Sequence, residues 1–266
     1  MKNGFVIFLA AFFALGTSWL LFVLEPQLEL GGAKQVAILN SSDVYPLQRT
    51  GAATLGLQVY RANGCAACHT TQVQQDKTVC DVVLANAGPH ADAVSNLLAT
   101  LKLDGLTEEE AGKASDQITA LGGKVETHVI PVGTDIARGW GTRHSVAEDF
   151  LYDYPVQLGS LRAGPDLANV GARLPDANWQ FLHLYAPQAV MKGSLMPSFR
   201  YLFTTQKIGN APAPDALKLP KELAPADGYE VVPTTKAKEL VAYLLSLNAE
   251  VPLYDAPYTP PATTKP

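Results

Sequence analysis

Three side chains able to do chemistry lie within five residues of one another. Cys65, Cys68 and His69 form the pattern C-x-x-C-H within YRANGCAACHTTQ, residues 60–72. This pattern suits three kinds of site: a thiol redox pair, a metal site with further ligands, and the attachment point of a haem. Each requires a different partner elsewhere in the chain.

The surroundings disfavour the first two kinds of site. A thioredoxin-like pair needs a strand before it and a βαβ frame around it, whereas the preceding stretch, residues 50–64, predicts a helix. A structural zinc site needs further Cys or His ligands at paired spacing. The remaining cysteine and histidines are instead scattered: Cys80, His90, His128, His144 and His183.

The third kind of site fits. C-x-x-C-H is typical of covalent c-type haem attachment, in which two thioethers hold the macrocycle and the histidine binds the iron. With only three cysteines in the chain, no disulfide framework explains the pair. We therefore expect one haem c, bonded to Cys65 and Cys68 and ligated by His69.

The iron then needs a sixth ligand or must stay open. Met196 precedes a proline and follows a Gly-Ser step, so a loop can present its sulfur. Met191 follows an Ala-Val pair and is interpreted as a packing residue. His183, on an aromatic-rich helix, is the competing ligand. The pattern favours Met196.

The stretch RAGPDLANVG, residues 162–171, supplies a further element. Any G-P-D sequence first predicts a turn. Pro165 has no N–H of its own, and we expect its carbonyl to accept the Nδ1–H of His69, as partners of metal-ligating histidines do. Arg162 is interpreted either as the partner of a haem propionate or as a solvated surface charge.

Helices are expected to position these groups. Residues 50–64 predict a short helix that ends at Gly64, with Gly56 and Tyr60 in a close-contact patch. Residues 234–250 form the best-patterned amphipathic helix of the chain. Pro187 is expected to stop a helix that begins near residue 175, and Ser145 with Glu148 suggests a capping box.

Residues 77–130 have a different texture. VCDVVLANA and KVETHVIPV alternate as strands do, and two helical stretches lie between them. The second of these opens with a capping box of Thr107 and Glu110. We interpret the block as an inserted α/β subdomain without chemistry, in which Cys80 is a buried thiol packed with the Leu97 and Leu101 helix.

The amino-terminal segment is the most apolar part of the chain. Phe5–Leu24 carries no charge and has the length of a membrane-crossing helix. A cleaved signal peptide is the alternative, but no small-residue cleavage site follows Leu24. Lys2 before the span places the remainder outside the cytoplasm. The net charge of −5 gives no basic face, so nucleic acid is not an expected partner.

These features resemble a known family. The helix, C-x-x-C-H, G-P-D-L, M-P and the final L-V-A-Y-L helix are similar to a class I cytochrome c. The stretch from DIARGWGTRHS to MPSFRYLF, residues 135–203, resembles the membrane-anchored monohaem subunit II of cbb3-type cytochrome c oxidases. The resemblance covers residues 1–75 and 134–250. It implies thioethers at Cys65 and Cys68 and axial ligands at His69 and Met196.

The resemblance also implies partners and a location. It implies a multi-span haem–copper catalytic subunit, other cytochrome c subunits, and a soluble or tethered electron donor. The chain would sit in the bacterial inner membrane with its haem domain on the periplasmic face, and would pass single electrons without an oxygen-reducing site of its own. The alternatives are the small cytochrome subunit of a nitric oxide reductase, a free-standing anchored carrier, and a haem-based gas sensor.

The expected fold is therefore mainly α, with five parts. An anchor, residues 1–24, leads through a linker, residues 25–48, to a cytochrome c domain built from residues 49–76 and 131–250. The inserted subdomain, residues 77–130, divides this domain in sequence. A Pro-rich tail, residues 251–266, is expected to lie extended over a partner or in solvent.

Overall fold

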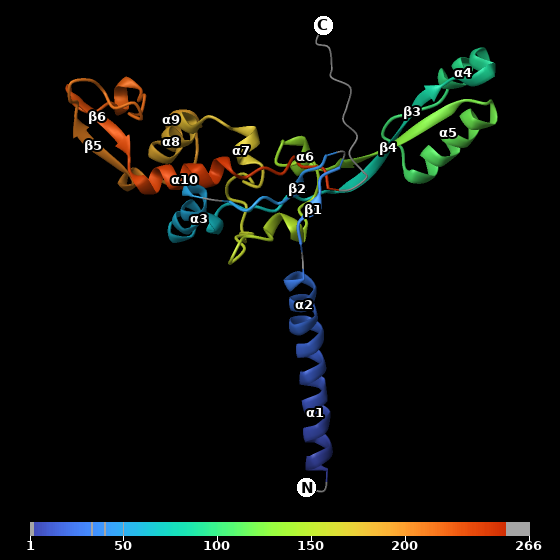
Figure 1. Cartoon of the computed structure of the whole chain (residues 1–266), viewed down its shortest axis with the longest axis horizontal. Helices are drawn as coiled ribbons and strands as arrows, with labels where there is room; N and C mark the ends of the chain where they lie inside the picture. Colours follow the sequence, from blue (N-terminus) through green and yellow to red (C-terminus); the bar gives the residue numbers. More distant parts are fainter. Residues whose placement is uncertain (1–2, 33, 40, 50, 254–266) are drawn as a thin grey trace.

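The computed structural model describes residues 3–32, 34–39, 41–49 and 51–253, so Lys2 and all but the first three residues of the Pro-rich tail lie outside the described residues. The described chain is mainly helical and has three arms (Figure 1). A helical stem carries the amino terminus, a lobe of helices lies to one side of its top, and a narrow strand-and-helix arm extends to the other.

The stem is one continuous helix. It runs through α1 (Gly4–Trp19), a π-helical turn (Leu20–Leu24) and α2 (Glu25–Gly31). The portion Gly4–Glu29 is long and apolar enough to cross a membrane, and none of its apolar stretch is buried against the rest of the protein. The predicted span lies within this helix, but the segment expected to be a linker from residue 25 begins as two further helical turns.

The lobe is centred on two crossing helices, α3 (Ala52–Ala62) and α10 (Thr235–Leu245). They approach closely because Gly56 has no side chain: a Cβ there would lie 2.0 Å from the Glu239 carbonyl oxygen. One turn later, the Tyr60 and Tyr243 rings contact each other with centroids 5.2 Å apart. The predicted close-contact patch of Gly56 and Tyr60 is therefore confirmed, with α10 as its partner.

Shorter elements close the lobe. Around α10 lie α7 (Val170–Arg173), α8 (Ala177–Tyr185) and α9 (Pro187–Val190). Helix α8 ends before Pro187, as predicted, and this proline opens α9. The helices of the lobe and two of its strands, described in the next paragraph, share one core. Its buried apolar side chains are Val59, Tyr60, Val170, Leu184, Leu202, Phe203, Val231, Ala237, Leu240, Val241, Tyr243, Leu244 and Leu247.

Two small antiparallel hairpins were not anticipated. One joins β5 (Phe203–Lys207) to β6 (Tyr229–Pro233) at the far end of the lobe. The other joins β1 (Val36–Ala37) to β2 (Val44–Tyr45) inside the expected linker. Short helical turns complete the chain: η2 (Cys65–Ala67), η3 (Gly88–His90), α6 (Thr134–Ala137), η4 (Ala147–Phe150), η5 (Arg200–Leu202) and η6 (Lys221–Leu223).

The predicted capping box of Ser145 and Glu148 is wrong. The turn η4 begins one residue later than expected, and the Asp149 carboxylate accepts the Val146 N–H at 2.9 Å. Asp149 is in turn held by the Arg143 guanidinium. Ser145 instead turns its hydroxyl oxygen to the Val73 N–H, 2.9 Å away. The serine therefore joins two distant segments and caps no helix.

The arm has the predicted order of strand, helix, helix and strand. β3 (Lys77–Asn86) pairs antiparallel with β4 (Lys124–Val132), with α4 (Ala91–Leu98) and α5 (Glu108–Ala120) between them. The capping box of Thr107 and Glu110 is confirmed. Strand pairing continues to Val132, two residues beyond the expected end of the block.

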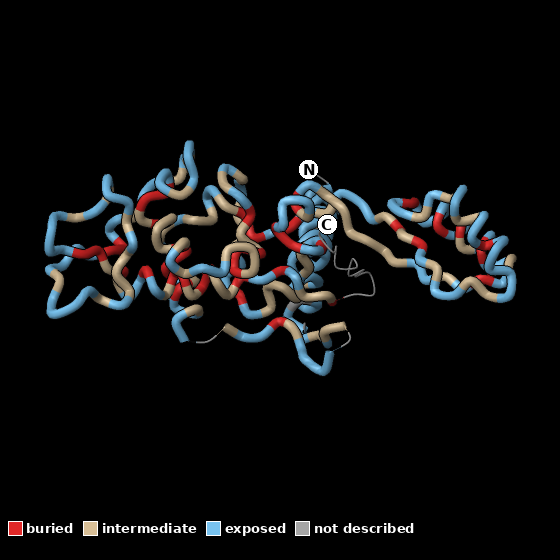
Figure 2. The backbone as a smooth tube through the Cα atoms, turned by 90° about the horizontal axis from the view of Figure 1, so that it is seen from above, coloured by how far each residue is buried: buried red, intermediate tan, exposed pale blue. Residues whose placement is uncertain are grey.

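The arm has a core of its own. Cys80 and Val82 on one face of β3 pack with Val94, Ile118 and partly buried leucines that include Leu97 and Leu101. Cys80 is a buried free thiol, as predicted. Figure 2 shows the buried residues of the arm as a group separate from those of the lobe.

The arm is expected to be removable. Lys77 and Val132 are cross-strand partners at its base, so their Cα atoms are only about 5 Å apart and a linker of two to four Gly/Ser residues can replace the residues between them. Because the arm core shares no buried residue with the lobe core, the lobe should keep its free energy of unfolding to within about 1 kcal/mol. The measurement is thermal unfolding and the haem absorption spectrum of the chain in which only the arm is replaced. Loss of the haem from that variant would contradict the independence of the arm.

Candidate haem site

The pentad follows directly from the end of α3. The helix closes at Ala62, and Gly64 takes a left-handed conformation with φ of 66°, which favours glycine. A tight turn follows, in which the His69 N–H donates to the Cys65 carbonyl oxygen at 3.0 Å. This turn leaves Cys65 half-buried and Cys68 exposed.

The segment after the pentad is joined to the G-P-D stretch. Nδ1 of His69 lies 2.8 Å from the Pro165 carbonyl oxygen, the contact that the sequence predicts. The Gly164 N–H donates to the Cys68 carbonyl oxygen at 2.9 Å, and the Leu167 N–H donates to the Thr70 carbonyl oxygen at 2.8 Å. Two segments almost a hundred residues apart in sequence are thus paired over their backbones.

A fully buried carboxylate lies at the centre of this pairing. Asp166 accepts the Gln72 N–H at 2.8 Å, the Ala168 N–H at 2.8 Å and the Thr70 hydroxyl at 2.5 Å. Such donors offset the cost of removing a charge from water. Asp166 was not predicted as a site residue, because its position in G-P-D indicates only a turn.

Arg162 does not lie free in solvent. Its Nη1 donates to Asp135 at 2.8 Å, its Nε to the Thr70 hydroxyl at 3.0 Å, and its Nη2 to the Gln72 carbonyl oxygen at 2.5 Å. The reading of Arg162 as a solvated charge is therefore wrong. Most of its donors are also committed to this chain, which leaves it poorly suited to a propionate. Its structural effect is to fasten the same two segments together.

Two glycines that were not predicted as site residues, Gly159 and Gly164, fit against His69. A Cβ on Gly164 would lie 2.3 Å from Cε1 of the His69 ring. A Cβ on Gly159 would lie 2.2 Å from the His69 carbonyl oxygen, and this residue has φ of 77°. Any larger residue at position 164 would push the imidazole out of place. In the sequence, only their closeness to Pro165 indicated that these glycines lie near His69.

The two methionines differ in their surroundings. Met196 is half-buried and packs against the lobe core together with Cys65 and Ala66. Its N–H donates to the Ser194 hydroxyl at 3.2 Å. Met191 is 53 % exposed, so its interpretation as a packing residue is wrong. Of the two, only Met196 joins the core that supports the pentad.

Three buried polar atoms near the pentad have no hydrogen-bond partner among the described residues. They are the Tyr60 hydroxyl, Nε of Arg173 and Nδ1 of His183. Burial lowers the pKa of the Arg173 guanidinium, and Asp166 partly opposes that effect. Burial likewise lowers the pKa of His183, with a further contribution from the charge of His69. Orphaned polar groups beside a C-x-x-C-H turn fit a site shaped for a polar-edged macrocycle.

The thiols do not fit a redox pair. Burial raises the pKa of the Cys65 thiol to about 11, whereas thiol redox chemistry requires a lowered pKa. Across the described part of the chain, no group of three His, Cys, Asp or Glu side chains is arranged to hold a metal ion. A haem, whose ligands here would be one histidine and one methionine, needs no such group.

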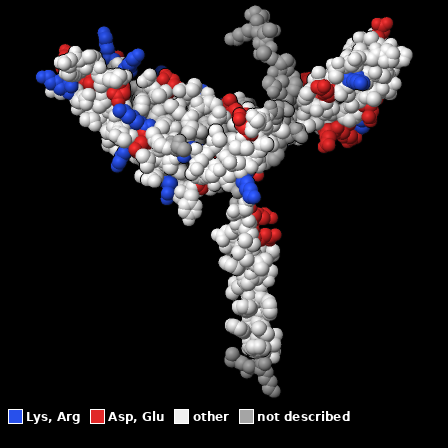
Figure 3. Space-filling view, viewed as in Figure 1, with Lys and Arg blue, Asp and Glu red and all other residues white. Residues whose placement is uncertain are grey.

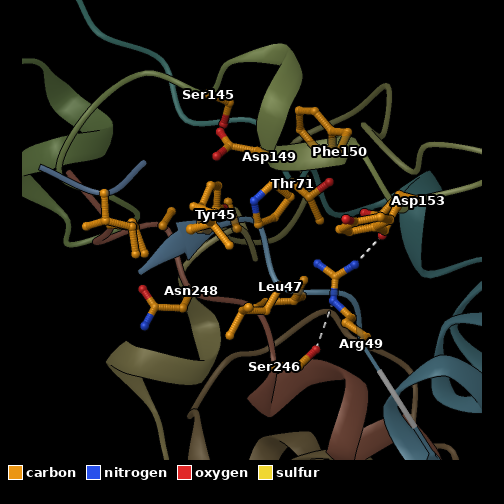
Figure 4. A pocket seen from close by; sticks show the side chains of 18 of the residues that line it. Tyr45, Leu47, Arg49, Thr71, Ser145, Asp149, Phe150, Asp153, Ser246 and Asn248 are labelled. Atoms are coloured by element: carbon orange, nitrogen blue, oxygen red, sulfur yellow. Dashed lines mark hydrogen bonds and ion pairs between the residues drawn. The ribbon is translucent and has the colours of Figure 1, made fainter. Parts of the chain in front are cut away.

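A pocket of about 510 Å³ has Thr71, two residues after His69, among its lining residues (Figure 4). It is lined by the linker around Tyr45 and Leu47, by η4, and by the end of α10. Arg49 crosses it, forming an ion pair with Asp153 and donating through Nε to the Ser246 hydroxyl at 3.1 Å. Arg49 thereby ties the segment that follows the stem to the lobe.

Residues 127–224 match the family model described as cytochrome C oxidase, mono-heme subunit/FixO. The matched stretch contains Arg162, Pro165 and Met196, and it confirms the resemblance over residues 134–224. Cys65, Cys68 and His69 lie outside the match. The match supports a monohaem electron-transfer subunit of a cytochrome c oxidase, which implies a haem and a catalytic partner subunit. Comparison with curated proteins gave no match.

Substitution of Gly164 by alanine should disturb the His69 ring. The added Cβ overlaps Cε1, so either the ring or the 162–166 segment must move, at a cost of about 1–3 kcal/mol. We expect a lower thermal midpoint and an altered haem absorption spectrum. Gly209 is the matched control because a Cβ there meets nothing within 4 Å. Equal behaviour of Gly164→Ala and Gly209→Ala would contradict the close fit at His69.

Proposed function

We propose that this chain is the electron-transfer subunit of a cbb3-type haem–copper oxidase, with one covalent haem c. Residues 49–76 and 131–250 would form a class I cytochrome c-like domain, and the stem would anchor it on the outer face of the membrane. Cys65 and Cys68 would form the thioethers. His69 and Met196 would be the axial ligands.

The observation that carries this proposal is the hydrogen bond between His69 and Pro165. A carbonyl oxygen only accepts, so Nδ1 must carry the proton and Nε2 is left as the free ligand atom. The bond also fixes the plane of the imidazole and raises its basicity, as such partners do for metal-ligating histidines.

Met196 is favoured over His183 as the second axial ligand. The Met196 loop packs on the core that bears Cys65, and the M-P sequence lies within the matched family region. His183 stacks flat on Trp179, with ring centroids 4.7 Å apart and planes at 10°. This stacking holds the imidazole as a packed side chain. We propose that the unpartnered Nδ1 of His183 donates to a polar group at the edge of the haem rather than binding the iron.

The chain's own residues would orient the haem and exclude water from it. Arg173 has a buried, unpartnered Nε, so it replaces Arg162 as the preferred partner of a propionate. Tyr60 and α10 would close the side of the proposed haem site that faces the lobe core. A haem with His and Met ligands supplies one-electron transfer, with methionine raising its reduction potential. With both axial positions taken, the chain would pass electrons and leave oxygen reduction to its partner.

The family match favours an oxidase over the small subunit of a nitric oxide reductase, since it is to the mono-heme subunit of cytochrome c oxidase. A gas sensor would need a labile sixth position. Met196 packs against the lobe core, so as a ligand it would be held in place and the sixth position would not be labile. A free-standing carrier differs from the oxidase subunit only in lacking a fixed partner. Purification of the chain with or without a multi-span subunit distinguishes these two functions.

Replacement of Met196 by alanine should remove the sulfur-to-iron charge-transfer band and lower the midpoint potential. Met191→Ala is the matched control, because this exposed methionine lies five residues away on the same loop. It should leave both the band and the potential nearly unchanged. The reverse pattern, recorded by absorption spectroscopy and redox titration, would refute the ligand assignment.

The function is tested by purifying the tagged full chain in mild detergent. We expect a multi-span haem-bearing subunit to purify with it, and oxygen consumption with a reduced donor. His69→Ala should abolish this activity, while His90→Ala, an exposed histidine on the arm, should not. Haem that stays with the denatured chain would verify the thioethers. A chain that purifies alone would favour the free-standing carrier and overturn the oxidase proposal.

A further inference from the structure

Two carboxylates and two guanidiniums lie together beside the segment that follows the pentad. Both carboxylates, Asp135 and Asp166, are buried, and both guanidiniums, Arg162 and Arg173, are half-buried. Nη1 of Arg162 lies 2.8 Å from Asp135, and its Nη2 lies 3.6 Å from Asp166. Nη2 of Arg173 donates to the Asp166 carbonyl oxygen at 3.3 Å. Two positive and two negative charges therefore balance each other beside the proposed haem site.

Asp166 is linked to His69 by two short routes. Its carboxylate accepts the hydroxyl of Thr70, the residue that follows His69, at 2.5 Å. Its backbone continues from Pro165, whose carbonyl oxygen lies 2.8 Å from Nδ1 of His69. The negative charge is therefore close to the imidazole, and three hydrogen-bond donors of the chain hold it in place.

Burial keeps this charge from being screened. Salt and water weaken the field of charges on the surface. Figure 3 shows such charges where lysines and arginines gather at the far end of the lobe and acidic residues on the arm. The Asp166 side chain is fully buried, and a charge in the protein interior acts through a lower effective dielectric constant than in water. We therefore expect Asp166 to influence a group bound at His69 more strongly than an exposed carboxylate does.

A fixed negative charge has a definite effect on a one-electron carrier. The oxidised form of a haem carries one more positive charge than the reduced form, so a nearby anion stabilises the oxidised form and lowers the reduction potential. A nearby cation has the opposite effect. Burial and hydrogen bonding around the axial ligands are further means by which a protein sets the potential.

We propose that Asp166 is a positioning residue that also lowers the reduction potential of the haem through its charge, against the increase that methionine ligation produces. Arg162 is its counter-charge and limits the decrease. This inference rests on the proposed function and deepens it, because it names the residues that set the potential of the electron carrier.

The test is potentiometric redox titration of the full chain in detergent, with two substitutions of opposite charge effect. Asp166→Asn keeps the size of the side chain and one oxygen that accepts hydrogen bonds, but it removes the negative charge. It should shift the equilibrium toward reduced haem by about tenfold, which raises the midpoint potential by about 59 mV. Arg162→Gln removes a positive charge and should shift the equilibrium several-fold toward oxidised haem.

The opposite signs separate an effect of charge from a general loosening of the site. Loss of the proposed methionine ligand would lower the potential of either variant, so such damage does not explain an increase in Asp166→Asn. In both variants the sulfur-to-iron charge-transfer band and the electron paramagnetic resonance spectrum of the ferric haem should match those of the unmodified chain. Asp176→Asn is the matched control, because this exposed carboxylate caps α8 and asparagine caps helices equally well. It should leave the potential unchanged.

Shifts of both variants in the same direction, or an Asp166→Asn potential equal to that of Asp176→Asn, would overturn the role of Asp166. Should Asp166→Asn fail to fold, Arg162→Gln decides. A lowered potential with an unchanged charge-transfer band then supports the inference, and an unchanged or raised potential overturns it. A full chain without covalent haem would overturn the proposed function together with this inference. Covalent haem with the same potential in all variants would leave the proposed function intact and overturn this inference alone.

Discussion

The lobe depends on one buried carboxylate. Asp166 is fully removed from water and is stabilised only because donors from two distant segments converge on it. Removing those donors would leave a buried charge uncompensated, which costs several kcal/mol. The carboxylate therefore fixes the distance between the segment after the pentad and the segment that carries Pro165. The position of the His69 ring follows from this distance.

Further contacts repeat the same constraint. Arg162 joins Thr70 and Gln72 to Asp135, and Asp135 also accepts the Gln74 N–H at 2.8 Å. The two sides of the arm's base are thus fastened on the lobe side of Lys77 and Val132. This explains how a chain can carry an arm between its haem-attachment motif and the rest of its site. The ends of the insertion are already held together before the arm begins.

The sequence was informative where the signal is local. Capping at Thr107 and the turn at Gly64 each depend on a few neighbouring residue types, and each is present. The contact of His69 with Pro165 is an exception, because it joins residues 96 apart and was predicted from the need of a metal-ligating histidine for a hydrogen-bond partner. The sequence failed where the outcome depends on distant contacts. Ser145 bonds to Val73 rather than capping a helix, and Arg162 turns inward because Asp135 and Thr70 face it. No pattern within either segment encodes those partners.

The sequence also failed to predict which of the two methionines is buried and which is exposed. Both lie in one short loop, and composition alone assigned Met191 to the core, yet Met191 is exposed and Met196 packs beside Cys65. The Met196 N–H donates to the Ser194 hydroxyl, which helps to hold this part of the loop against the core. An electron carrier needs its iron surroundings rigid, because movement of the ligands costs energy at every transfer. The hydrogen-bonded Pro165 side holds the histidine firmly. If Met196 is the second axial ligand, as proposed, its loop is braced only by the Ser194 hydroxyl and by packing on the core, so we expect the Met196 side to be the more deformable half of the site.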